Sequence, residues 1–210
     1  MPTLEILGRA TSLNVRKVLW TCAELGLPYS HVEWGAGDLS LQDPAFLALN
    51  PNALVPVIRD GDFVLWESNT ICRYLAAKAG RTDLLPAEPA ARAQVEKWMD
   101  WQATELNNAW RYAFMGLVRQ SPAFADPAQI AASVSAWNRQ MALLDGALQA
   151  SGAYLAGAQL TLADVAVGLA THRWFMTPID PRPDLPAVQA YYERLSERPG
   201  FRAHGRNGMP

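Results

Sequence analysis

The chain has 210 residues, a formal net charge of −2 and a hydrophobic fraction of 50%. This length permits one large domain or two small ones, and the charge and composition exclude a disordered chain, a basic nucleic-acid-binding surface and an acidic tail. No run reaches the roughly 20 apolar residues of a membrane span and the N-terminus lacks a signal-peptide pattern, so we expect a soluble, cytoplasmic protein with neither nucleic acid nor a membrane as partner.

The start of the chain predicts two strands joined by a helix. Thr3 to Leu7 is the first predicted strand, an apolar stripe with helical spacing runs from Val15 to Leu25, and Tyr29 to Glu33 is the second strand. Strands connected through a helix in this way are parallel members of one sheet. We therefore expect a βαβ unit at the start of the chain.

Residues 50–68 predict a β-hairpin that leads into a helix. Asp60-Gly61 separates two apolar runs, which is a strong short-range signal for a hairpin turn. Pro56, in the first run, has no N–H to donate to a sheet, so it indicates an edge strand, a bulge or a cis peptide bond. Each of these leaves backbone groups free for another partner. A helix is predicted over residues 67–79.

The rest of the chain predicts helices only. The segment 81–89 is rich in turn residues and is a predicted linker between domains. Helical patterns follow over Ala90 to Gln120, Pro127 to Gln149, the residues after Thr161, and Asp184 to Arg198. Asn107-Asn108 lowers the helix propensity of the first of these, so we expect a bend there, and Pro199-Gly200 is expected to end the last.

Several common catalytic patterns are missing from the sequence. It has neither of the glycine-rich phosphate motifs GxGxxG and GxxxxGK[ST], nor the GxSxG of serine hydrolases. Its three histidines are scattered and neither Cys22 nor Cys72 belongs to a CxxC pair, so we expect no metal site. Both cysteines lie in helical patterns and are expected to be reduced core residues.

Three features remain as candidates for binding or chemistry. Ser12 lies just before the first helix, where capping is the favoured interpretation and a hydroxyl facing a ligand is the alternative. At such a helix start the free N–H groups and the dipole favour an anion. Val55-Pro56 offers a free backbone edge. Glu67-Ser68 begins another helix and suits the ammonium and carboxylate of an amino-acid head group.

The order of these elements, together with the segments NPNALVPV, ESNTICRYL and TLADVAV, resembles the cytosolic glutathione transferases over essentially the whole chain. The sequence is most similar to bacterial, theta-like members with a serine near the N-terminus, whose motif SLNVRKV matches in position. The resemblance implies a thioredoxin-like domain (βαβ-ββα) over residues 1–80, a linker over 81–89 and an all-α domain over 90–210. It further implies a homodimer, glutathione as co-substrate without a metal, and attack of the glutathione thiol on small hydrophobic electrophiles.

The resemblance also implies roles for individual residues. Ser12 would donate a hydrogen bond to the glutathione sulfur, with Asn14 as the alternate. Pro56 would be a cis-proline that leaves the backbone of Val55 to pair with the cysteinyl part of glutathione. The residues expected to bind glutathione are Leu54, Val55, Pro56, Glu67 and Ser68, of which the last two would hold the γ-glutamyl ammonium and carboxylate. Thr161 and Asp164 resemble the family's helix-capping motif, which is a folding element.

One position departs from the family pattern. Leu54 stands where many members carry a lysine for the glycine carboxylate of glutathione, and Gln42 and Arg9 are the candidate substitutes.

Three aromatic residues of the helical half are candidates for the wall of an electrophile site, with core packing as the other interpretation. These residues are Trp110, Phe114 and Trp174. Two further functions stay open from the sequence. One is glutathione-dependent reduction of peroxides or disulfides, and the other is a binding module without catalytic activity.

Overall fold

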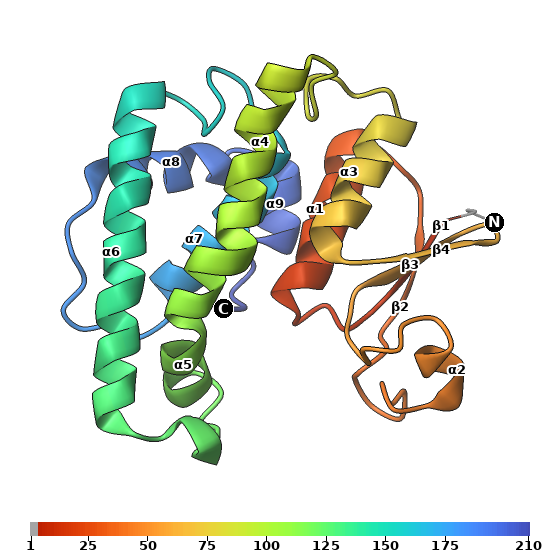
Figure 1. Ribbon diagram of the computed structural model, residues 1–210, viewed down its shortest axis with the longest axis horizontal. Coiled ribbons are helices and arrows are strands. Elements are labelled where there is room, and N and C mark those ends of the chain that lie inside the picture. Colours follow the sequence, from red (N-terminus) through yellow and green to blue (C-terminus); the bar gives the residue numbers. More distant parts are fainter. Residues whose placement is uncertain (1–3) are drawn as a thin grey trace.

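The computed structural model describes residues 4–210 and places a small sheet beside a larger bundle of helices (Figure 1). The elements of the sheet half are β1 (Leu4–Leu7), α1 (Leu13–Leu25), β2 (Ser30–Val32), α2 (Pro44–Leu47), β3 (Val57–Asp60), β4 (Phe63–Trp66) and α3 (Ser68–Lys78). Thr3, the first residue of the strand that we predicted, lies outside the described residues.

The sheet confirms both the predicted βαβ unit and the predicted hairpin. Its strands lie in the order β2-β1-β3-β4, with β1 and β2 parallel and β3 antiparallel to both of its neighbours. Ile6 of β1 is paired with Ile58 of β3, and both share a core with α1 and α3. Because side chains alternate between the faces of a strand, the adjacent Leu7 and Val57 pack instead on Phe46 of α2. Both faces of the sheet are therefore covered.

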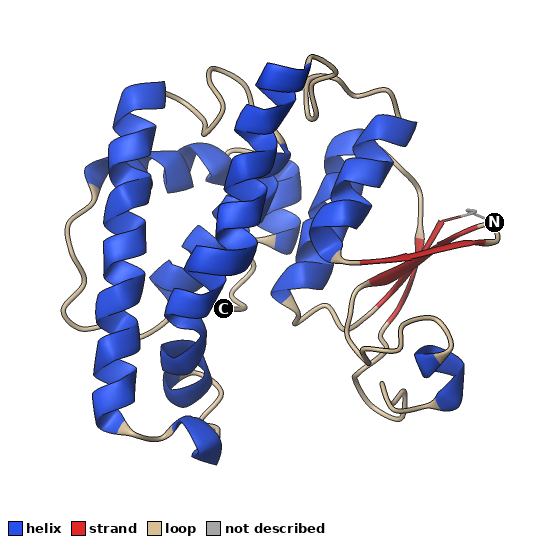
Figure 2. Ribbon diagram, in the orientation of Figure 1, coloured by secondary structure: helices blue, strands red, loops and turns tan. Residues whose placement is uncertain are grey.

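The other half consists of helices. They are α4 (Pro89–Trp101), α5 (Asn107–Leu117), α6 (Pro127–Ser151), α7 (Leu162–Met176), α8 (Pro186–Ser196) and α9 (Pro199–His204). Figure 2 shows the strands of the described residues gathered at one end of the molecule, apart from this bundle. Among the helices within residues 4–210, none combines the length and the apolar character that a membrane crossing requires.

The long helix predicted over residues 90–120 is interrupted close to the expected bend. A π-helical turn, Gln102–Leu106, joins α4 to α5 and ends directly before Asn107. Such a turn inserts extra backbone into a helix, and each residue of an α-helix rotates the chain by about 100°. The side chains of α5 therefore face a direction that an unbroken continuation of α4 would not give them.

A further helix follows the point where we predicted the last helix to end: α8 ends at Ser196 and α9 begins at Pro199. Pro199 occupies the first turn of α9, where a helix needs no N–H from that residue. Gly200 lies so close to α1 that a Cβ on it would be 2.6 Å from Cδ1 of Trp20. Pro199-Gly200 therefore follows the helix end that we predicted, but the predicted helix is not the last one, because the same dipeptide starts α9 and permits a close contact.

Helix α1 contributes to the core of both halves. It lies beside α3 between the sheet and the helical bundle (Figure 1), and it also packs against α7 and α9. Trp20 of α1 is fully buried, with its ring centroid 4.9 Å from that of Phe201 in α9. The two halves therefore share one continuous apolar core.

The predicted capping motif is present at the start of α7. Asp164 is fully buried, and its carboxylate accepts hydrogen bonds from the backbone N–H groups of Thr161 (2.8 Å) and Leu155 (3.0 Å) and from the hydroxyl of Tyr191 (3.1 Å). Burial raises the pKa of Asp164 to about 6, although these hydrogen bonds act in the opposite direction. The carboxylate thus ties α7 to the preceding loop and to α8.

Replacing Asp164 with alanine is expected to lower the free energy of unfolding by about 3 kcal/mol or more, because three buried donors, on Leu155, Thr161 and Tyr191, lose their acceptor. Asp164→Asn keeps one acceptor oxygen, so its free energy of unfolding should fall less. Urea unfolding measures both, with the exposed Asp184→Ala as the control. Equal stability of Asp164→Ala and the control would contradict the role given to this carboxylate.

Candidate functional site

The hydroxyl of Ser12 is free of the capping role that the sequence favoured. Ser12 occupies the N-cap position of α1 with extended backbone angles (φ −79°, ψ 124°), yet its side chain makes no capping hydrogen bond. The backbone N–H of Ser12 donates a hydrogen bond to the carbonyl of Arg9, at 3.0 Å. A partly buried hydroxyl at the start of a helix is therefore available to a ligand.

The peptide bond between Val55 and Pro56 is cis, one of the three conformations that the sequence allowed. Among the described residues, no hydrogen bond engages the backbone N–H or carbonyl of Val55. The preceding turn is held by the buried Asn50, whose Nδ2 donates to the carbonyl of Leu54 at 2.8 Å. The turn is thus fixed from inside, and the edge at Val55 is left free.

Glu67 and Ser68 lie at the start of α3. Glu67 has a φ of +74°, an uncommon backbone conformation for a residue other than glycine. This conformation turns the chain from β4 into the helix and leaves the Glu67 side chain exposed. Ser68 is buried in the first turn of α3. A carboxylate and a hydroxyl therefore stand next to each other at a helix N-terminus.

Three cavities bring most of the predicted residues together, and Asn14 lines all of them. The first, of about 50 Å³, is lined by Leu54, Val55, Pro56, Glu67 and Ser68. The second, of about 310 Å³, shares Glu67 and Ser68 with the first. The third, of about 270 Å³, is lined by Ser12, Trp110 and Phe114. Together they form a groove around the N-terminus of α1, which we call the α1 groove.

Two of the predicted residues lie outside the α1 groove. Trp174 is only 1% exposed, and its indole N–H donates to Oδ1 of Asn138 at 3.0 Å. The guanidinium of Arg182 covers its ring at 4.9 Å, so core packing is the role that the structure shows for Trp174. Gln42 lines none of the three cavities, whereas Arg9 lines the one at Ser12.

Two buried charged residues of the groove were not predicted. Lys17 is only 2% exposed, lines the second cavity and donates to Oδ1 of Asn69 at 3.1 Å. Burial lowers the pKa of Lys17 to about 8, while the nearby charge of Glu67 acts to raise it. Arg173 lines the third cavity from α7. Sequence alone did not indicate either, since a charged residue in a helical pattern is normally on the solvent-exposed face.

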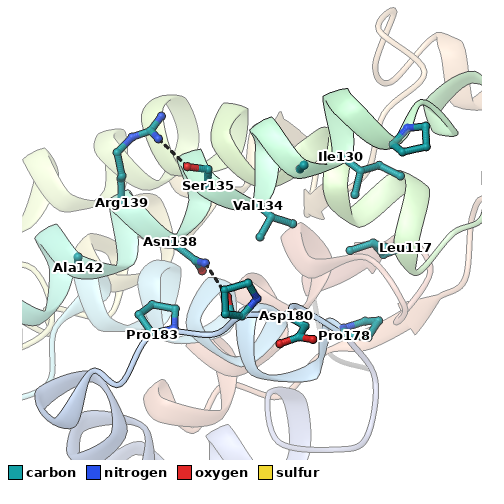
Figure 3. A pocket seen from close by; sticks show the side chains of 13 residues that line it. Leu117, Ile130, Val134, Ser135, Asn138, Arg139, Ala142, Pro178, Asp180 and Pro183 are labelled. Atoms are coloured by element: carbon teal, nitrogen blue, oxygen red, sulfur yellow. Dashed lines mark hydrogen bonds between the residues drawn. The ribbon is translucent and has the colours of Figure 1, made fainter.

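A larger cavity, of about 770 Å³, lies elsewhere, between α5, α6 and the segment 178–183. Figure 3 shows two hydrogen bonds within it: Arg139 donates to Oγ of Ser135 at 2.9 Å, and Asn138 donates to the carbonyl of Pro181 at 3.2 Å, while the carboxylate of Asp180 makes none among the residues drawn. It contains none of the predicted residues. We therefore place the functional site in the α1 groove, where free polar groups from both halves converge.

Two family models match the chain. One is described as "Glutathione S-transferase, N-terminal domain" and matches residues 11–78, and the other is described as "Glutathione S-transferase, C-terminal domain" and matches residues 107–199. Both models therefore include residues of the α1 groove.

Individual proteins are similar over nearly the full chain. Glutathione S-transferase GstB of Escherichia coli is 43% identical over 203 residues, which cover 95% of this chain and 96% of that protein. Glutathione S-transferase 3 of Zea mays is 36% identical over 211 residues, which cover 96% of this chain and 92% of that protein. The crystal structure of the theta class glutathione S-transferase from Xanthomonas axonopodis pv. citri with glutathione bound superposes with a TM-score of 0.91 at 41% identity, covering 98% of both chains.

The burial of Lys17 predicts an unusual titration. In protein labelled with ¹³C-lysine, the NMR signals of Lys17 should titrate near pH 8, because burial disfavours the charged amine. Glu67→Gln should shift this midpoint further down, since the Glu67 charge raises the pKa of Lys17. Lys78 is the internal reference, because its hydrogen bond to Asp60 raises its pKa above the ordinary value. A Lys17 midpoint as high as that of Lys78 would contradict this placement.

Proposed function

The chain belongs to the glutathione S-transferase family, and we propose that Ser12 activates the thiol of glutathione for attack on a small hydrophobic electrophile held by the helical half. The thioredoxin-like and all-α domains and the transferase activity that the resemblance implied are confirmed. The observation that carries the role of Ser12 is its free hydroxyl, which lines the same cavity as Trp110 and Phe114.

The chemical demand on Ser12 is modest. An ordinary thiol has a pKa near 8.5, and lowering it to about 7 requires roughly 2 kcal/mol. One hydrogen bond to a charged acceptor contributes about 1.5–3 kcal/mol, and a helix N-terminus adds some tenths. The Ser12 hydroxyl donates to the sulfur, and the thiol proton passes to solvent. The thiolate then bonds to the electrophilic carbon, and a leaving group departs with the bonding electron pair.

Glutathione lies, in this proposal, along the free edge at Val55 with its γ-glutamyl group in the cavity of Glu67 and Ser68. The unused backbone groups of Val55 support antiparallel pairing with the cysteinyl residue. Glu67 accepts from the ammonium, while Ser68 and the start of α3 bind the carboxylate. The buried amine of Lys17 adds a positive charge on the carboxylate side.

We propose that residues 1–80 and 90–210 form the two domains, joined by 81–89, and that the protein is a cytoplasmic homodimer. The dimer rests on the family resemblance, and the exposed Phe63 and Trp66 of the edge strand β4 provide apolar surface for a partner. A sizing column tests it against the monomer mass of 23.1 kDa. The cytoplasm is proposed because it maintains a pool of reduced glutathione.

Ser12→Ala is expected to lower kcat/KM for conjugation about 10- to 100-fold, the loss that corresponds to one hydrogen bond to a charged sulfur. The pH profile of kcat/KM should shift upwards, because the bound thiol becomes less acidic. Both are measured with glutathione and a neutral chloronitrobenzene.

Thr11→Ala is the matched control, because Thr11 lines the same cavity and also carries a hydroxyl. Unchanged conjugation in Ser12→Ala would remove Ser12 from the mechanism, and a selective loss in Asn14→Ala would assign the role to Asn14. Hydroperoxide turnover above conjugation in the unmodified protein would favour the reduction reaction that the resemblance also allows.

A further inference from the structure

Arg173 is a buried cation without a counter-charge. It extends from α7, is only 5% exposed and lines the cavity at Ser12. Among the described residues, no hydrogen bond or ion pair involves its guanidinium, and its Nε is buried without an acceptor. Its contacts are with aromatic rings, at 4.1 Å from the centroid of Phe114 and 4.5 Å from that of Trp110.

Such an arrangement is unfavourable in the free protein. Removing a charge from water is costly unless a partner of opposite charge replaces the water, and a ring face replaces it only in part. Burial and the neighbouring Arg16 and Arg119 lower the pKa of Arg173, yet a guanidinium still keeps its proton at neutral pH. The cavity therefore contains a permanent positive charge that no described residue pairs.

The rest of the cavity wall has the same sign of charge. Four arginines line it, Arg9, Arg111, Arg119 and Arg173, and no aspartate or glutamate of the described residues does. Arg9 donates to the carbonyl of Gly35 at 3.1 Å, but Arg111 and Arg119 have exposed side chains without an acceptor among the described residues. The guanidinium of Arg119 lies 5.5 Å from the centroid of Phe114, the ring that Arg173 also covers.

We propose that the electrophile carries an anionic group, a carboxylate or a similar oxyanion, which Arg173 binds together with Arg111 and Arg119. This inference rests on the proposed function and narrows its substrate class. The apolar part of the electrophile packs on Trp110 and Phe114, and its reactive carbon faces the sulfur held at Ser12. A guanidinium and a carboxylate form two parallel hydrogen bonds, which fixes the orientation of the electrophile as well as its charge.

The arginines also offset the repulsion between an anionic electrophile and the thiolate. Two negative charges in one small cavity repel each other strongly unless cations lie between or beside them. A neutral electrophile needs no such compensation. The excess of positive charge is thus better matched to a charged electrophile than to an uncharged one.

The experiment compares two electrophiles that differ in charge, 4-chloro-3-nitrobenzoate and 4-chloro-3-nitrobenzamide, at saturating glutathione. In both reactions the sulfur–carbon bond forms, the carbon–chlorine bond breaks, chloride leaves with the bonding pair and the thiol proton passes to solvent. Each kcat/KM is divided by the uncatalysed rate constant for the same compound. The unmodified protein should prefer the benzoate at least tenfold, and this preference should fall as salt is added.

Arg173→Met should lower the corrected kcat/KM for the benzoate about 10- to 100-fold, because the benzoate loses a charge-assisted pair. The corrected kcat/KM for the benzamide, which makes no such pair, should change less than about threefold. Arg173→Lys should keep part of the preference for the benzoate that Arg173→Met loses. Arg119→Gln should reduce the same preference by a smaller factor. Arg139→Gln, on the separate cavity beside α6, is the control and should change neither value.

An equal fall in kcat/KM for both electrophiles would overturn the proposal, because it would mean that the arginines stabilise the glutathione thiolate and not the electrophile. A raised KM for glutathione with both electrophiles would also overturn it and assign them to the glycine carboxylate. Calorimetry with the unreactive 3-nitrobenzoate separates this inference from the proposed function. Binding that weakens tenfold or more in Arg173→Met supports the anion site even if Ser12→Ala conjugates normally, and the absence of binding to the unmodified protein refutes it.

Discussion

The burial of α1 on every side is the constraint on which the rest of the structure depends. One side of this helix closes the core of the sheet with α3, and the other packs against α7 and α9. Even its charged residues are inside: Arg16 donates to the carbonyls of Met209 (2.8 Å) and Pro210 (2.9 Å), and Lys17 bonds to Asn69 and Gln102. Only the N-terminus of the helix opens to cavities, and Asn14 therefore touches all three parts of the groove.

The two sides of this N-terminus differ in charge. The side of α3 combines the carboxylates of Glu67 and Asp100 with the amine of Lys17, which suits a group that itself carries both signs of charge. The side of α5 and α7 has arginines, and none of its lining residues within 4–210 is an acid. This difference supports the proposal that glutathione lies along the groove with its zwitterionic end on the side of α3 and its thiol at the boundary between the mixed and the positive region.

The sheet, the hairpin and the irregular backbone before it were predictable because their signals are local: Asp60-Gly61 specifies a turn, and Pro56 excludes a regular ladder at its position. Which of several similar residues reach the groove was not predictable. Trp110 and Trp174 have the same chemistry and similar helical surroundings in the sequence, and only the packing of α5 and α7 separates them. Arg173 was missed for the related reason that its burial depends on residues distant in the chain. Pro199-Gly200 follows the end of α8 as predicted, but the same dipeptide also permits α9 to begin against the ring of Trp20, which the sequence did not indicate.

The π-helical turn between α4 and α5 has a consequence for how this protein can diverge. One additional residue in a helix rotates everything after it by about 100°, so the wall formed by Trp110 and Phe114 owes its direction to that turn. Insertion or deletion of a single residue there would turn other side chains of α5 toward the cavity at Ser12 while α4 kept its packing on α7. A length change in this one helical turn would therefore alter the wall of the cavity without any substitution of the aromatic residues themselves.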